Sequence, residues 1–72
     1  MMTIDGVIRA ELEEAVQDIF DMANCEDHFS FEEVLCIVFK FYGAVTQAVQ
    51  FCVITAEQAH SLHCWLVAMF EL

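Results

Sequence analysis

Residues 30–54 read SFEEVLCIVFKFYGAVTQAVQFCVI and form the longest apolar run of the chain. It opens with Ser30-Phe31-Glu32-Glu33, a capping box. In such a box the serine hydroxyl accepts from the amide of Glu33, and the Glu33 carboxylate reaches back to the serine amide. Apolar residues then occupy nearly every side of the helical turn, which is typical of a helix at the centre of a small protein. We therefore predict a central helix over residues 31–42.

Gly43 interrupts this apolar stretch. A glycine here can end a helix in a left-handed cap, or the helix can pass through it with a kink. We expect separate helices over 31–42 and 44–54, with one kinked helix as the alternative. The β-branched and aromatic residues of 34–54 would also suit strands, which is the main competing fold class.

Helical signals continue on both sides of this stretch. Apolar residues recur at steps of three and four over residues 4–23, where Thr3 or Asp5 can cap the helix. Thr55-Ala56-Glu57-Gln58 is a second capping box and predicts a last helix over 56–70. The sequence thus predicts one all-α domain over residues 1–72, a small bundle of three or four helices.

The chain is more apolar than so small a core requires. Hydrophobic residues make up 60% of the 72 positions, whereas a domain of about 60 residues buries only about 60% of its unfolded surface. We expect the surplus to drive homodimerisation, because twofold dimers are the commonest closed oligomers. The residues expected to form the core or the dimer contact are Val38, Phe41, Val49, Leu62, Leu66 and Phe70.

Acidic residues concentrate in the first half of the chain. Ten of the twelve lie between Asp5 and Glu33, and the net charge is −10. Such a charge repels nucleic acid and favours a partner protein with a basic surface. One helix face carries a row of carboxylates that the following loop extends, so the predicted partner-binding residues are Glu11, Glu14, Asp18, Asp21, Glu26 and Asp27.

A carboxylate row of this kind suits a groove that normally holds a phosphate backbone. We therefore expect an inhibitor that mimics nucleic acid and blocks a nucleic-acid-handling protein. Small acidic proteins of phages and mobile elements that disable restriction, CRISPR or transcription machinery share this length and charge. The alternative is a helical adaptor or subunit that binds through its apolar half, with the acids serving only solubility.

A metal-responsive module is a further alternative. Cys25, His28, His60 and Cys64 are residue types that bind zinc, although their spacing is not that of a known finger. Residues 22–33 resemble an EF-hand calcium loop, but Met22 and Asp27 stand where an oxygen ligand and a turn glycine are needed. Helix caps and buried cysteines explain the same residues, so we expect no bound metal and no cofactor.

No catalytic motif accompanies these features, and we expect no enzymatic activity. The N-terminus lacks the basic and apolar regions of a signal peptide, which favours a cytoplasmic protein with reduced thiols. The run 34–54 is long enough to span a bilayer. However, it contains Lys40, Gly43 and two glutamines and lacks flanking basic residues, so we expect no membrane insertion.

Overall fold

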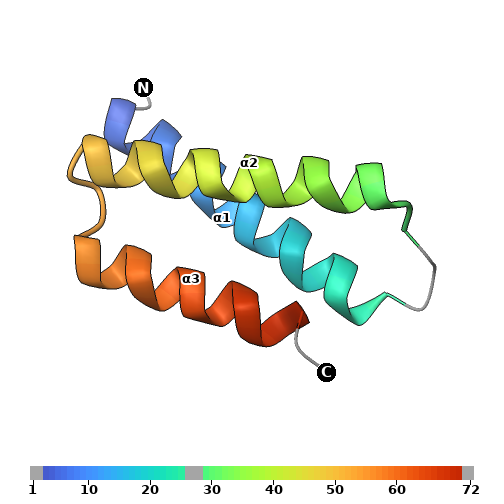
Figure 1. Ribbon diagram of the computed structural model, residues 1–72. Coiled ribbons are helices and arrows are strands. Elements are labelled where there is room, and N and C mark those ends of the chain that lie inside the picture. Colours follow the sequence, from blue (N-terminus) through green and yellow to red (C-terminus); the bar gives the residue numbers. More distant parts are fainter. Residues whose placement is uncertain (1–2, 26–28, 71–72) are drawn as a thin grey trace.

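The computed structural model describes residues 3–25 and 29–70, which form three helices (Figure 1). These are α1 (Ile4–Asn24), α2 (Phe31–Gln50) and α3 (Ala56–Phe70). α1 and α2 share the most extensive interface, and α3 packs against both less extensively. The all-α expectation is confirmed, with three helices and no strand in the described part of the chain.

α1 begins where its sequence provides a cap. Of the two candidate caps, Thr3 is the one used, because the Gly6 amide donates to the Thr3 hydroxyl at 3.1 Å. The buried stripe of the helix then follows the three- and four-residue steps of the sequence. Its members are Ile8, Leu12, Ala15, Ile19 and Met22.

α2 is one continuous helix, so the predicted break at Gly43 is wrong. Phe41 and Ala44 lie on a buried face that continues without interruption across Gly43. Packing of this face outweighs the cost of a glycine in a helix interior, which is about 1 kcal/mol. A Cβ added at Gly43 would meet nothing within 4 Å, so the residue is not required for close packing.

The helix ends at Gln50, four residues before the predicted end at residue 54. Its last turn is closed by a Schellman motif. The Val53 amide donates to the Ala48 carbonyl at 2.8 Å, and the Cys52 amide donates to the Val49 carbonyl at 3.0 Å. Cys52 therefore takes the left-handed conformation, with φ of 58°, at a position that glycine usually occupies.

α3 begins with the predicted capping box in full. The Gln58 amide donates to the Thr55 hydroxyl at 3.1 Å, and the Thr55 amide donates to the Gln58 carboxamide at 2.9 Å. The cap at Ser30 also forms, since its hydroxyl accepts from the Glu33 amide at 3.2 Å. Both helix starts were thus predicted correctly from four-residue patterns.

The predicted core residues differ in burial. Phe41 is fully buried at the centre of the bundle, with its ring 6.0 Å from that of Trp65, and Leu66 is buried on α3. The others are less enclosed: Val38, Val49 and Leu62 are half-buried, and Phe70 is exposed.

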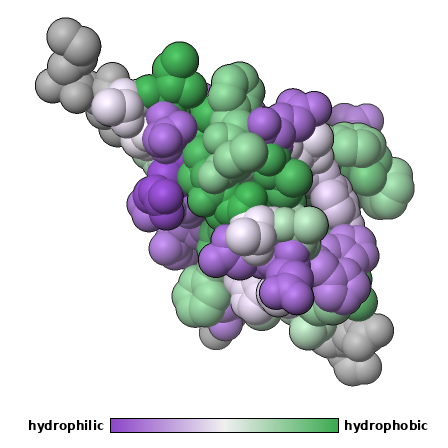
Figure 2. Space-filling model, turned by 90° about the vertical axis from the view of Figure 1, so that its left-hand side faces the viewer, coloured by the Kyte–Doolittle hydropathy of each residue, from purple (hydrophilic) through white to green (hydrophobic). Residues whose placement is uncertain are grey.

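The bundle is less compact than a typical domain with this number of residues. Its radius of gyration is 12.8 Å, against about 11 Å for a compact domain of this size. Large apolar side chains remain exposed on all three helices and on the connection between α2 and α3. Figure 2 shows hydrophobic surface at the centre of the end face of the bundle, with hydrophilic groups to its left and right. Within the described residues, no helix is long and apolar enough to cross a membrane.

Candidate protein-binding surface

One flank of α1 carries four of the predicted partner-binding residues, and we call it the acidic flank: Glu11, Glu14, Asp18 and Asp21. Glu11, Glu14 and Asp21 are exposed, and Asp18 is half-buried. Glu11 and Asp21 are ten positions apart, which is about 15 Å along a helix that rises 1.5 Å per residue. The buried stripe of the same helix packs into the core, which holds the flank along the surface of the bundle.

Lys40 of α2 reaches the middle of the acidic flank. Its Nζ lies 2.8 Å from Glu14 Oε1 and 3.0 Å from Asp18 Oδ2. These hydrogen bonds raise the pKa of Lys40 above its usual 10.5, the bond to Glu14 being the larger cause and that to Asp18 the second. No sequence pattern predicts this contact, because Lys40 is 26 positions from Glu14 and 22 from Asp18, and they meet only after α1 and α2 pack.

The two ends of the flank are different. Asp21 accepts a hydrogen bond from the Gln17 carboxamide of its own helix at 2.8 Å, and Glu11 is exposed. Neither carboxylate meets Lys40, so neither forms an ion pair with α2. Glu26 and Asp27, the predicted extension of the row, lie outside the described residues.

The predicted metal ligands are only partly brought together. His60 and Cys64 are adjacent on the surface of α3, with Nε2 and Sγ 3.6 Å apart. Cys25 is exposed just after α1, and His28 lies outside the described residues. Among the residues that the structure describes, no three histidine, cysteine or acidic side chains form a cluster suited to a metal ion.

Residues of the EF-hand-like stretch have structural roles in the bundle. Met22, at the first ligand position of the loop, is a buried core residue of α1. The Ser30 hydroxyl caps α2 by accepting from the Glu33 amide. These residues therefore serve helix packing and capping.

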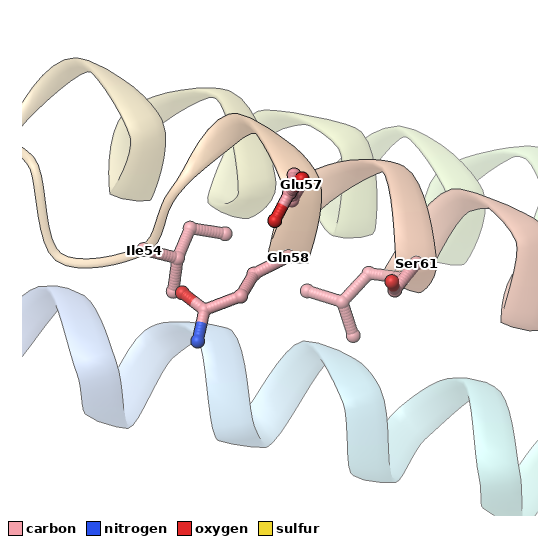
Figure 3. A pocket seen from close by; sticks show the side chains of 5 residues that line it. Ile54, Glu57, Gln58 and Ser61 are labelled. Carbon is pink, nitrogen blue, oxygen red and sulfur yellow. The ribbon is translucent and has the colours of Figure 1, made fainter.

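An open depression lies beside the start of α3, lined by Ile54, Glu57, Gln58, Ser61 and Leu62. Figure 3 shows the Gln58 side chain extending from α3 toward the ribbon of α1. Gln58 also completes the cap with Thr55. The lining brings together one carboxylate and one hydroxyl, with no histidine, lysine or cysteine among its five residues.

Several large aromatic side chains are also exposed on the bundle. Phe31 and Phe39 of α2 are 76% and 67% exposed, and Phe51, just after α2, is 52% exposed. Ile4, 67% exposed, lies at the start of α1, at the same end of the bundle as the connection between α2 and α3 (Figure 1). Side chains of this kind offer large contact area to another protein.

Comparison with known proteins identifies no relative of this chain. No family model matches it, and neither a curated protein nor a solved structure does so.

Proposed function

We propose that the protein is a binding module whose acidic flank occupies a basic surface of a nucleic-acid-handling protein and inhibits it. The observation that carries this proposal is the alignment of four carboxylates along one side of α1, three of them exposed. Their placement on a packed helix matters, because a preformed charged surface loses less conformational entropy on binding than a flexible segment does.

The charge balance supports a basic partner. The chain has twelve acidic residues against two lysine or arginine residues, whereas ordinary protein surfaces intersperse both signs. Such an excess destabilises a small domain through self-repulsion and also steers a cationic partner toward it. A partner that normally grips a phosphate backbone presents the required cationic groove.

Lys40 divides the acidic flank into parts with different roles. The pair that it contacts, Glu14 and Asp18, joins α1 to α2. Glu11 and Asp21, on either side, face solvent without a cationic partner from α2. The partner's basic groups would therefore meet Glu11 and Asp21 most directly. At the central pair, Glu14 and Asp18, these basic groups would compete with Lys40.

The test is affinity capture from the native host's lysate at low and high salt, followed by displacement with added duplex DNA or RNA. A nucleic-acid-handling protein released by either treatment supports the proposal, because exposed ion pairs are screened by salt. Charge reversal of Glu11 and Asp21 to lysine should abolish capture. Charge reversal of Glu57 on α3 is the matched control and should leave capture unchanged.

A second function rests on a different observation, the exposed aromatic residues of α2. A helical adaptor would bind an apolar groove or helix through Phe31 and Phe39. In that case the captured partner survives high salt and is lost in Phe39→Ala. The Glu11 and Asp21 reversals then have little effect. This outcome would remove the acidic inhibitor and favour the adaptor.

A further inference from the structure

The surface of α3 carries a pair of side chains whose geometry matches half of a zinc site. His60 and Cys64 are one turn apart and both are exposed. The distance from His60 Nε2 to Cys64 Sγ is 3.6 Å. This separation is compatible with a thiol-to-imidazole hydrogen bond. It is also close to the distance between two ligands of one metal ion.

Tetrahedral zinc requires nearly the same separation between its ligands. With a Zn–S distance of about 2.3 Å and a Zn–N distance of about 2.0–2.1 Å, sulfur and nitrogen at the tetrahedral angle lie about 3.6 Å apart. His60 and Cys64 therefore already lie at the separation that two ligands of one zinc ion require. Imidazole and thiolate are also the donors that zinc prefers in proteins.

Two ligands leave the coordination shell half-filled. Within the described residues no third histidine, cysteine or carboxylate joins the pair. The pair lies on a helix surface, so a second chain can approach it. A twofold axis through the metal would bring in the same two residues from a second copy, which completes a shell of two histidines and two cysteines.

The surroundings of the pair suit a second copy of this chain. Glu57 is the single charged residue between Ala56 and Phe70, and Val67, one turn after Cys64, is 42% exposed. The acidic flank lies on the side of α1 that Lys40 of α2 contacts. Contact through α3 would therefore avoid placing one acidic flank directly against another.

We propose that His60 and Cys64 form a half-site for zinc, and that zinc joins two copies of the protein through α3. On binding, the Cys64 thiol loses its proton to solvent, and the neutral His60 imidazole binds through Nε2. Dimerisation by zinc should consequently weaken as the pH falls, because protons compete for both ligands. This inference is independent of the acidic flank and of the function proposed for it.

The experiment uses the full chain with a non-thiol reductant, titrated with Zn²⁺ and with Co²⁺ as a spectroscopic probe. We expect one ion for every two chains, thiolate-to-cobalt charge transfer with tetrahedral ligand-field bands, and a mass in sedimentation that doubles from 8.2 kDa. A chelator should restore the monomer. Cys64→Ser and His60→Gln should each abolish the zinc-dependent dimer.

Matched controls separate this site from other donors. Cys36→Ser removes another exposed thiol, and His63→Gln removes the neighbouring imidazole, whose Nδ1 lies 3.0 Å from the Tyr42 hydroxyl. Both variants should dimerise with zinc as the native chain does. One ion per monomer, loss of binding in Cys25→Ser, or a dimer that persists unchanged in chelator would overturn the proposal. Retention of zinc binding in Cys64→Ser would do the same.

Discussion

Replacing Phe41 by alanine should remove a large part of the stability of this protein. Phe41 is fully buried, and its ring lies 5.9 Å from that of Tyr42 and 6.0 Å from that of Trp65. Truncation of a buried phenylalanine costs about 3–5 kcal/mol through lost transfer energy and the cavity left behind. At about 0.05–0.15 kcal/mol per residue, a chain of this length has only about 4–11 kcal/mol of stability.

The expected result is a fall of at least about 12 °C in Tm, because 1 kcal/mol corresponds to about 4–8 °C in a domain of this size. The measurement is urea and thermal unfolding, followed by helical circular dichroism and by Trp65 fluorescence. Phe39→Ala is the matched control, since Phe39 lies on the same helix and is 67% exposed. That change should alter the free energy of unfolding by no more than about 0.5 kcal/mol.

Equal losses in the two variants would refute this account of the core. Phe39 would then be buried in an assembly, and the loss of stability in Phe39→Ala should depend on protein concentration. A Phe41→Ala variant that unfolds like the native chain would show that α1 and α2 do not pack as described.

Three further changes test individual contacts. Gly43→Ala should raise the free energy of unfolding by about 0.5–1 kcal/mol, seen as a higher urea midpoint, because a Cβ there meets nothing and alanine favours the helix. Cys52→Gly should stabilise by up to about 1 kcal/mol in the same assay, since φ of 58° strains a side chain, whereas Cys52→Val should destabilise. The raised pKa of Lys40 means that its stabilising contribution is full below 10.5 and is lost as the pH rises through the higher folded value. The difference in urea midpoint between the native chain and Lys40→Met should therefore shrink at alkaline pH, and a difference independent of pH and salt would contradict the ion pairs with Glu14 and Asp18.

The helix starts illustrate what local sequence predicts well. Thr3, Ser30 and Thr55 each satisfy an amide three residues ahead. Such bonds form within a single turn and depend little on the rest of the chain. The periodic burial of α1 is equally local in origin, because one face of a helix repeats every three or four residues.

The acidic flank was predicted as a row of equivalent carboxylates, and the structure makes its members unequal. Lys40 engages Glu14 and Asp18 and leaves Glu11 and Asp21 to solvent. No local pattern indicates which acids a lysine on another helix will meet. The contact depends on the rotation and crossing of α1 and α2, which their buried faces determine together.

The all-α class, the three helix starts and the concentration of acid in the first half all follow from local sequence patterns. The continuity of α2 through Gly43 and the position of Lys40 depend instead on packing between helices. The two groups of features differ in the distance along the chain over which the underlying interactions act. Caps and helical periodicity act within about four residues, whereas Gly43 stays helical because Phe41 and Ala44 on the same helix are buried in packing that α1 and α3 complete.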